Sequence, residues 1–551
     1  MLAFFIDNMA PIMFLALVLF LLLGYPAAFS LGAVGLLFGL IGIELGLFVP
    51  DFIQALPERV YGVMANDTLL AIPFFTFMGL VLERSGMAED LLDTIGHLFG
   101  TVRGGLAYAV IFVGALLAAT TGVVAASVIS MGLISLPIMM RYGYDRRVAS
   151  GVIAASGTLA QIIPPSLVLI VMADQLGRSV GDMYEGAFIP GLVLSALYAS
   201  YVFGVSLIYP NATPGLPAEA VGFREADGSR GLTSLAILTA ASGVFGWFMM
   251  RNSESHGADY VVLTMFSGIL FAFAIAVLDW LVERLFKVRV LSLIARQTTF
   301  VMVPPLFLIF LVLGTIFLGV ATPTEGGAMG AVGALLLGLA KRRLTFDLIR
   351  QAVQSTAKLS AFVVFILVGA RVFSLTFYGV SGHIWVEHML TSLPGGQVGF
   401  LIFVNAFVFV LAFFLDFFEL AFIIIPLLGP AAEKLGIDLI WFGVILGVNM
   451  QTSFMHPPFG FALFYLRSVA PRESYIDRVT GKKTDGITTG QIYWGAVPFV
   501  FIQVIMVILV ILFPSMVMHY KGVGTGVDPN KVKIDIPGLD VPAPDTNFNF
   551  K

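Results

Sequence analysis

Two clusters of polar and helix-breaking residues lie within long apolar stretches. The first belongs to VIAASGTLAQIIPPSLVLIV (Val152–Val171), and the second is NMQTSFMHPPFG (Asn449–Gly460). Hydroxyls, amides and backbone carbonyls freed from a broken helix are hard oxygen ligands for a small cation, and half-helix N-termini favour an anion. The oxygen donors we expect are Thr120, Thr121, Ser156, Thr158, Asn449, Thr452 and Ser453.

Each hydroxyl alone has a simpler explanation. Ser and Thr in helices often donate a hydrogen bond to a carbonyl of the preceding turn. Two matching clusters are harder to explain in this way. Backbone that leaves the helix at membrane depth must be buried or line a cavity, because each unsatisfied group costs several kcal/mol in hydrocarbon.

The composition places these clusters in a membrane protein. The chain has 551 residues, of which 58% are hydrophobic and 12% charged, and its mean hydropathy is +0.97. Repeated apolar runs predict an all-α polytopic protein with about 12 transmembrane helices and two additional hairpins. The chain has no cysteine, which excludes disulfides and thiolate chemistry, and no basic, aromatic-rich patch that would indicate nucleic-acid binding.

The N-terminal stretch, Met1–Ser30, could be a cleaved signal peptide. It has no basic residue before its apolar core and carries Asp7 instead. It overlaps the segment from Gly24 to Leu40, which resembles Ala321–Leu339 deep inside the chain. We therefore expect it to form the first helix of the mature protein.

An internal repeat relates the two polar clusters. Pro137, Asp145 and Pro164 recur as Pro430, Asp438 and Pro457, at a constant offset of 293 residues. A shared Pro, Gly-x-Asp and Pro-Pro in one ungapped register is rare between unrelated apolar segments.

The basic residues suggest that the two repeats are inverted. Positive charges favour cytoplasmic loops, and they are concentrated in Arg141–Arg147, near Lys287, at Lys341 and at Lys482–Lys483. The loop Glu433–Asp438, which matches the first of these, is not enriched in this way. The matching loops are thus predicted on opposite sides of the membrane, as in many secondary transporters.

An apolar stretch of unusual length precedes each matching loop. Gly104–Met140 would be about 54 Å long as one helix, whereas a span needs about 30 Å. A re-entrant hairpin fits this length, with its tip at Ala118–Ser127, and the counterpart Gln397–Pro430 would have its tip at Phe413–Ala421.

These elements predict five regions of the chain. The first repeat covers 1–175, with a hairpin at about 104–140 and a broken helix at about 148–173, and the connecting helices cover 176–300, with two extra spans near Leu235–Met250 and Val261–Leu285. The second repeat covers 301–468, with a hairpin at about 397–430 and a broken helix at about 439–466. A cytoplasmic loop and the last helix cover 469–515, and a polar tail covers 516–551.

The chain resembles the large membrane subunit of tripartite ATP-independent periplasmic (TRAP) transporters, in a longer branch of DctM-like proteins. The resemblance covers about Pro11 to Pro514. The motifs that carry it are IPFF at Ile72, GTLAQIIPPS at Gly157, ATPTEGGA at Ala321, FFLDFFELAFIIIP at Phe413 and PPFGFALFYLR at Pro457.

The resemblance implies a sodium-driven elevator in the inner membrane of a Gram-negative-type bacterium. In such a transporter, a mobile domain that includes the hairpins and broken helices moves against a scaffold. A small four-helix membrane subunit and a periplasmic binding protein that delivers an organic acid are the implied partners. Na⁺ is the implied co-transported ion, with no organic cofactor.

Sodium sites between each hairpin tip and the following broken helix are also implied. They map onto Thr121, Gly122, Gly157, Thr158, Pro164, Asp416, Asn449, Ser453 and Pro457. The chain departs from the family pattern at Gln161, Ser453 and His456. The residues that we expect around the substrate are Thr120, Ser156, Gln161, Ser166, Arg371, Thr452 and His456.

Arg371 is an ionisable residue within the apolar stretch LSAFVVFILVGARVFSLTFYG. Such a residue costs at least about 2.5 kcal/mol at the membrane centre and indicates a functional role by default. It could bind a substrate carboxylate through two parallel hydrogen bonds. The alternative is a structural pair with Glu325, Asp416 or Glu419.

Three other functions remain as alternatives to the TRAP subunit. A stand-alone sodium–dicarboxylate symporter of similar design would need no partner protein. An intramembrane enzyme would need a second aspartate near Asp416 or a Ser-His pair, and neither is evident in the sequence. A passive channel is disfavoured because the repeats predict discontinuous sites and not a ring-forming pore.

Overall fold

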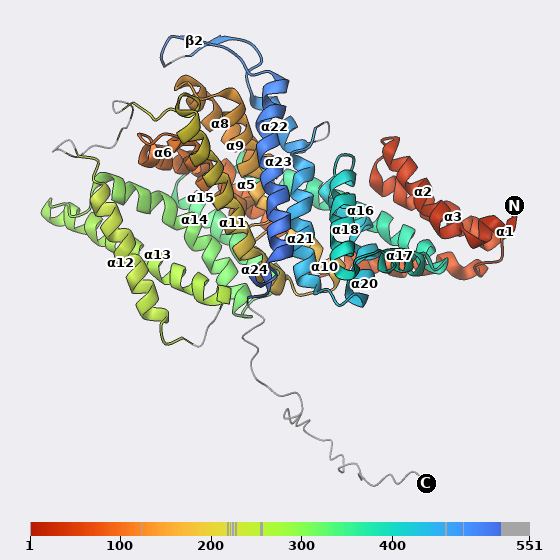
Figure 1. Cartoon of the computed structure of the whole chain (residues 1–551). Coiled ribbons are helices and arrows are strands. Elements are labelled where there is room, and N and C mark those ends of the chain that lie inside the picture. Colours follow the sequence, from red (N-terminus) through yellow and green to blue (C-terminus); the bar gives the residue numbers. More distant parts are fainter. Residues whose placement is uncertain are drawn as a thin grey trace, which may run out of the picture.

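The chain folds into helices joined by short loops, with one small two-stranded hairpin (Figure 1). The computed structural model describes residues 2–519 except 123, 218–219, 221, 223–224, 226–228, 254–256, 458–459 and 478. Most of the predicted polar tail, 516–551, lies outside the described residues.

The helices follow one another as the apolar runs predict. In the first part they are α1 (Leu2–Asp7), α2 (Met9–Leu22), α3 (Ala27–Glu44), α4 (Leu56–Met64), α5 (Ala71–Arg84), α6 (Met87–Phe99), α7 (Gly105–Thr121), α8 (Val124–Arg141), α9 (Arg146–Thr158), α10 (Leu167–Leu176), α11 (Val180–Ile208), α12 (Leu232–Met250) and α13 (Gly257–Phe286). In the second part they are α14 (Leu293–Phe317), α15 (Pro323–Ala340), α16 (Phe346–Gly379), α17 (Gly382–Thr391), α18 (Gly396–Leu411), α19 (Phe417–Ile423), α20 (Ile425–Lys434), α21 (Leu439–Met450), α22 (Phe461–Val469), α23 (Thr489–Leu512) and α24 (Ser515–Met518). Short 3₁₀ segments are η1 (Pro50–Ala55), η2 (Leu159–Gln161), η3 (Pro210–Ala212) and η5 (Gln451–Phe454), and the strands are β1 (Tyr475–Ile476) and β2 (Lys483–Thr484).

The helices of membrane length confirm an all-α polytopic membrane protein. Among the described residues, eight helices are long and apolar enough to span a membrane, or nine if α17 and α18, bent by 116°, are one span. This is fewer than the twelve or so expected, because several of the apolar helices have fewer than 18 residues. Arms and half-helices such as α10 are shorter.

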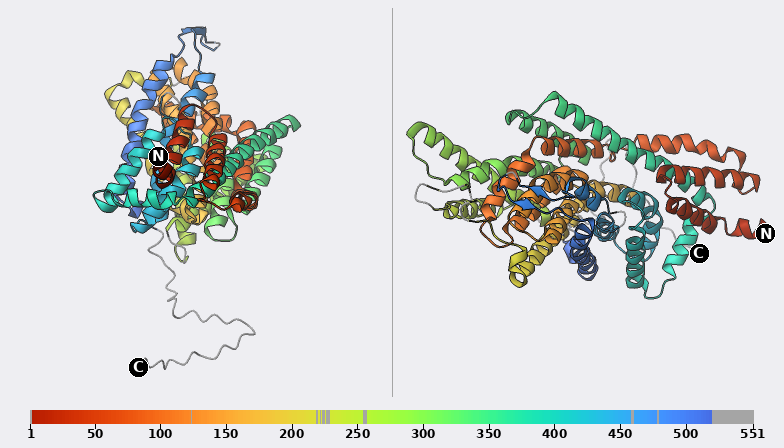
Figure 2. Two further views of the ribbon diagram at one scale, coloured as in Figure 1. Left: turned by 90° about the vertical axis from the view of Figure 1, so that its right-hand side faces the viewer. Right: turned by 90° about the horizontal axis from the view of Figure 1, so that it is seen from above.

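Two pairs of long helices pack closely beside the repeats. The α3 helix packs along α16, and α5 packs along α15. Glycines allow the first pair to approach closely, because a Cβ on Gly35 would lie 2.8 Å from the Cα of Phe373, and one on Gly369 would lie 2.4 Å from the carbonyl oxygen of Ala28. Seen from above, the molecule is elongated, with the N-terminal helices at one end and α12 and α13 at the other (Figure 2).

The helix boundaries follow the 293-residue offset found in the sequence. Helix α8 runs from Val124 to Arg141, and the matching pair α19 and α20 runs from Phe417 to Lys434. Asp145 and Asp438 both cap the next helix, by accepting hydrogen bonds from the backbone N–H groups two and three residues later. The packing is also reciprocal, since α10 contacts α21 and its counterpart α22 contacts α9.

The two matching loops lie at opposite ends of the molecule. Arg141 forms an ion pair with Asp477, beside the hairpin of β1 and β2 at the top of Figure 1. Arg178, which follows α10, forms an ion pair with Glu433 at the other end. The chain therefore runs through α9 and α10 in one direction and through α21 and α22 in the other. This is the arrangement expected of inverted repeats; its orientation in a membrane stays a prediction.

Candidate functional site

The first predicted hairpin is two helices joined at a glycine. Helix α7 ends at Gly122, which adopts a left-handed conformation (φ +56°), and α8 starts at Val124 and packs against α7. The break falls within the predicted tip, Ala118–Ser127. The side chains of Thr120 and Thr121, both candidate ligands, lie outside the part that the structure describes.

The first broken helix ends at Thr158 and resumes at Leu167. Between them, η2 is followed by a non-helical stretch that contains Pro164. The hydroxyl of Ser166 donates to the carbonyl of Gln161 (2.5 Å) and accepts from the N–H of Val168 (3.2 Å). Ser166 thus caps α10 and holds the break, a role different from the substrate contact predicted for it.

Gly157 lies where the broken helix meets the hairpin. A Cβ at this position would lie 2.2 Å from Cγ2 of Val128 and 3.2 Å from its backbone nitrogen. Only glycine therefore allows α9 to approach α8 this closely. Gly157 sets the distance between the two elements, whether or not its carbonyl binds an ion.

The second hairpin tip is built around two carboxylates. Asp416 accepts a hydrogen bond from the N–H of Glu419 (2.8 Å), and Glu419 accepts one from the N–H of Asp416 (3.0 Å). This reciprocal cap starts α19. Asp416 was predicted as a sodium ligand, whereas Glu419 was considered only as a partner of Arg371.

Three hydroxyls of the broken helices donate hydrogen bonds within their own turns. Thr158 donates to the carbonyl of Ala155 (2.8 Å), Thr452 to that of Asn449 (2.7 Å) and Ser453 to that of Met450 (2.7 Å). This is the geometry of the simpler structural explanation. A hydroxyl that donates keeps lone pairs that can bind a cation, so both roles are compatible with it.

Asn449 is held by a residue that the sequence did not single out. Its side-chain nitrogen donates to the backbone carbonyl (2.8 Å) and to the side-chain oxygen (2.9 Å) of Asn405 on α18. Because both bonds use the amide nitrogen, the amide oxygen of Asn449 is directed elsewhere and is available as a ligand. Asn405 interrupts an apolar run, and that was the signal available in the sequence.

The two broken helices touch at equivalent positions. The amide nitrogen of Gln451 donates to the carbonyl of Thr158 (2.6 Å), and these residues are 293 positions apart. A contact between equivalent residues of two repeats is expected on a two-fold axis. Gln503 of α23 extends this buried network to Tyr198 (3.0 Å) and Thr158 (3.4 Å). Gln451 and Gln503 were also missed, although Gln503 is a lone polar residue in an apolar run.

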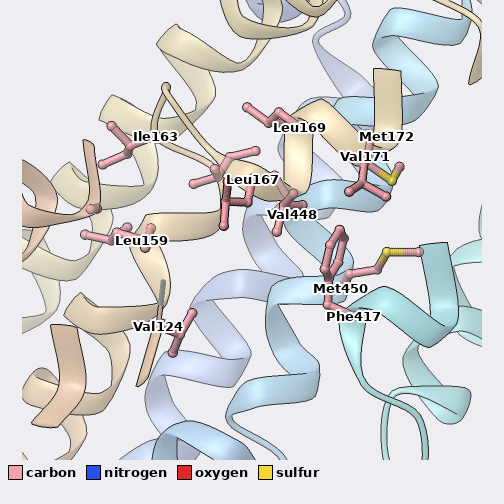
Figure 3. Packing of buried hydrophobic residues seen from close by; sticks show 14 of the residues in the cluster. Val124, Leu159, Ile163, Leu167, Leu169, Val171, Met172, Phe417, Val448 and Met450 are labelled. Carbon is pink, nitrogen blue, oxygen red and sulfur yellow. The ribbon is translucent and has the colours of Figure 1, made fainter. Parts of the chain in front are cut away.

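A cavity of about 610 Å³ lies where the hairpin tips meet the broken helices. Among the predicted site residues, Gly122, Gln161 and Asp416 line it. Val124, Phe417 and Leu167, the first residues of α8, α19 and α10, line it together and are labelled in Figure 3. The remaining wall comes from α3, α16 and α22. The cavity is large enough for a small organic molecule.

Ser156, His456 and Pro457, also predicted as site residues, are not among the described residues that line the cavity. The buried hydroxyl of Ser156 has no hydrogen-bond partner among the described residues. His456 is buried and stacks on Phe413 (4.2 Å between ring centres) with Phe409 at its edge (4.4 Å). Pro457 lies in the break before α22, as Pro164 lies in the break before α10.

Arg371 does not line this cavity. It lines a separate cavity of about 620 Å³, and among the described residues no ion pair joins it to Glu325, Asp416 or Glu419. Glu325 instead caps α15 with Thr322. Within the described chain, no group of three or more His, Cys, Asp or Glu side chains is placed to hold a metal ion.

Known proteins match almost the whole chain. A protein-family model described as "Tripartite ATP-independent periplasmic transporter, DctM component" matches residues 14–516. The C4-dicarboxylate TRAP transporter large permease protein DctM of Pseudomonas aeruginosa is 27% identical over 85% of this chain and 90% of that protein. The isethionate TRAP transporter permease protein DctMQ of Oleidesulfovibrio alaskensis is 24% identical over 84% of this chain and 60% of that protein.

A solved structure supports the fold. The YdaH transporter of Alcanivorax borkumensis, described as having an unusual topology, matches with a TM-score of 0.50 and 15% identity, over 85% of this chain and 90% of that one. At this identity, the likeness concerns the fold alone. The match of residues 14–516 to one family model shows that the chain belongs to the DctM family, the large membrane component of tripartite ATP-independent periplasmic transporters.

Proposed function

We propose that this chain carries a small organic acid across a bacterial inner membrane, driven by sodium. The observation that supports this most directly is the cavity between the two hairpin tips, with the oxygen-rich breaks of α9–α10 and α21–α22 beside it. A cavity next to two such breaks offers one place for a substrate and two for cations. The two relatives reported above are named for C4-dicarboxylates and isethionate, and a third, the permease protein SiaT of Haemophilus influenzae, is named for sialic acid; each of these molecules carries an acid group.

Sodium would bind on the two sides of the substrate. In the first repeat, the proposed ligands are at Gly122, Gly157 and Thr158, and in the second repeat at Asp416, Asn449 and Ser453. Binding of cations beside the cavity lowers the electrostatic cost of an anion within it. This physical link would couple the two solutes.

The proposed partners are a small four-helix membrane subunit and a periplasmic binding protein. The mobile part would contain the hairpins and broken helices, and α3, α5, α15 and α16 would belong to the scaffold. The main alternative, a symporter that acts alone, predicts uptake without a binding protein.

Uptake into proteoliposomes tests the proposal. The chain is reconstituted with the small subunit and the binding protein encoded beside it, and uptake of labelled succinate, isethionate and N-acetylneuraminate is compared under sodium and potassium gradients. We expect uptake of one acid that requires both sodium and the binding protein. Equal uptake with potassium would refute the sodium coupling, and equal uptake without the binding protein would favour the stand-alone symporter.

A further inference from the structure

A second polar cavity, distinct from the one between the hairpin tips, contains Arg371. Its volume is about 620 Å³, and its wall is formed by α4, the end of α10, the last third of α16, and α19 to α21. The polar residues that line it are Arg59, Asp174, Gln175, Arg371, Ser374, Tyr378 and Glu433. We refer to it as the arginine pocket.

The arginine pocket continues the first cavity along the same helices. On α16, Ile366 lines the first cavity and the next residue, Leu367, lines the arginine pocket. On α19, Glu419 lines the first and Phe422, one turn later, lines the second. The two spaces are thus consecutive along the groove between α16 and α19. About one turn of each helix separates the two cavities.

The charged side chains that line this pocket leave an excess of positive charge. Arg59 and Arg371 form no ion pair with any residue that the structure describes, and both line the cavity together with Tyr378. Of the two acids of the pocket, Glu433 is neutralised by its ion pair with Arg178 (2.9 Å), whereas Asp174 accepts hydrogen bonds from the amides of Asn66 (2.6 Å) and Gln175 (2.7 Å) and keeps its negative charge. The two arginines of the pocket therefore face one carboxylate that no described cation pairs with. Two guanidinium groups that share a cavity repel each other, and an anion between them removes this repulsion.

The donors suit a carboxylate. Guanidinium groups bind carboxylates through two parallel hydrogen bonds, and the hydroxyls of Ser374 and Tyr378 add single donors to the same space. The pocket lies at the end of the molecule that carries Arg178 and Glu433, opposite the basic loop of Arg141. By the distribution of positive charge, this end faces the periplasm.

We propose that the arginine pocket is an outer anion site, which binds a carboxylate of the organic acid before it enters the cavity between the hairpin tips. The proposal rests on the proposed function for the identity of the anion. It adds a second, separate binding site, on a wall that includes Arg59 of α4. A phosphate of an anionic lipid shares the chemistry of a carboxylate, and the experiment separates the two.

Chemical modification of arginine tests the site without transport. The purified chain, in nanodiscs of phosphatidylcholine, is treated with phenylglyoxal, and modification of each arginine is followed by peptide mass spectrometry. Succinate should slow modification of Arg59 and Arg371 about threefold at about twice its dissociation constant. The exposed Arg342, in the loop after α15, is the internal control, and neutral succinamide should protect none of the three.

Three results would overturn the proposal. Unchanged modification of Arg59 and Arg371 in succinate would show that the pocket binds no carboxylate. Equal protection of Arg342 would indicate a general ionic effect. Protection only in nanodiscs that contain phosphatidylglycerol, and none from succinate, would assign the pocket to a lipid headgroup.

Uptake measurements then ask whether the site serves transport. We expect Arg371→Gln and Arg59→Gln to raise KM for the acid about tenfold while kcat stays within about twofold. Arg371→Lys, which keeps the charge but loses the paired geometry, should give an intermediate KM. A fall in kcat with unchanged KM would contradict an outer site. If the unmodified protein shows no sodium-driven uptake, the proposed function fails, while the modification experiment still decides whether the pocket binds carboxylates.

Discussion

At the scale of single residues, Asn405 provides a test of the second sodium site. Its backbone and side-chain oxygens hold the amide nitrogen of Asn449. We expect Asn449→Ala to abolish sodium-dependent uptake, because it removes the proposed ligand. Asn405→Leu should only weaken sodium binding, since it frees the amide to rotate, and loss of a hydrogen bond of about 1 kcal/mol corresponds to a several-fold rise in half-saturating sodium.

The measurement is initial uptake as a function of sodium concentration in proteoliposomes. Asn252→Ala, in the exposed loop after α12, is the matched control and should leave the curve unchanged. Unaltered sodium dependence in Asn449→Ala, with the protein folded and inserted, would remove Asn449 from the site.

The residues missed in the sequence share a simple property. Asn405, Gln451 and Gln503 are buried amides with partners far away in the chain, at separations of 44, 293 and 305 residues. Composition and spacing identify a polar residue in an apolar run, but they do not show which distant group it meets. Arg371 illustrates the same limit, because its membrane-depth position was evident whereas its separate cavity was not.

At the scale of elements, Gly157 determines how closely the first broken helix approaches the hairpin. A methyl group there would overlap the short, stiff side chain of Val128, and the backbone nitrogen of that residue is only 3.2 Å away. Gly157→Ala should therefore displace α8 and lower stability by about 1–3 kcal/mol. The midpoint of thermal unfolding should fall, and sodium-dependent uptake should fall with it.

Gly204 on α11 offers a control for this substitution. No atom lies within 4 Å of a Cβ at that position. Alanine is a better helix former than glycine, so Gly204→Ala should leave the midpoint unchanged or raise it. If both variants behave alike, close packing at Gly157 does not limit stability.

Asp477 connects the β1–β2 hairpin, which we predict on the cytoplasmic side, to the helix bundle. This buried carboxylate accepts hydrogen bonds from the N–H of Thr480 (2.8 Å) and Val479 (2.9 Å) and pairs with Arg141 (2.9 Å). The bond from Thr480 and then the Arg141 guanidinium lower the pKa of Asp477 from 3.8 to about 2. The stability that the charged Asp477 gives to the folded hairpin is therefore fully present above about pH 4 and is lost only as the pH falls through about 2.

Trypsin cleavage at Lys482 and Lys483 measures how firmly the hairpin is held. Between pH 6 and about 8.5 we expect no change in the cleavage rate from titration of Asp477, since this group stays charged throughout. Asp477→Asn should accelerate cleavage across this range. Asp485→Asn, which alters an exposed acid of the same loop, is the control and should have little effect. Equal cleavage of all three proteins, after correction for the intrinsic pH dependence of trypsin, would show that Asp477 does not anchor the hairpin.

The main elements of the fold were predictable because their signals are local. Helices α9 and α21 end before the Pro-Pro pairs of the two apolar runs, and α7 ends at Gly122, within the unusually long stretch Gly104–Met140. The position of the second hairpin tip was harder to predict, because α18 ends at Leu411 and the next helix, α19, starts only at Phe417, with Asp416 as its cap. The number of spans was harder still, since short arms and half-helices do not differ from spans in composition.

At the scale of the whole molecule, the proposed elevator mechanism divides the structure into a moving part and a stationary part. The α3–α16 and α5–α15 pairs lie beside the hairpins and broken helices. Few polar contacts cross between the two groups near the predicted periplasmic end, and one of them joins Asn66, in the loop before α5, to Asp174 of α10 (2.6 Å). An elevator must break this contact when it moves.

Cross-linking tests this motion directly, because the chain has no cysteine and every introduced pair is unique. In Asn66→Cys/Asp174→Cys, a short reagent that bridges the two thiols should stop uptake by joining the moving part to the scaffold. In the control Arg146→Cys/Asp485→Cys, one position begins α9 and the other lies in the loop after α22, so the cross-link stays within the proposed moving part and the loop that follows it, and an equally complete cross-link should leave most uptake intact. Cleavage of a reducible linker should restore transport in the first pair. Full uptake by completely cross-linked Asn66→Cys/Asp174→Cys would show that α10 does not move relative to the loop before α5, and the elevator would have to be abandoned.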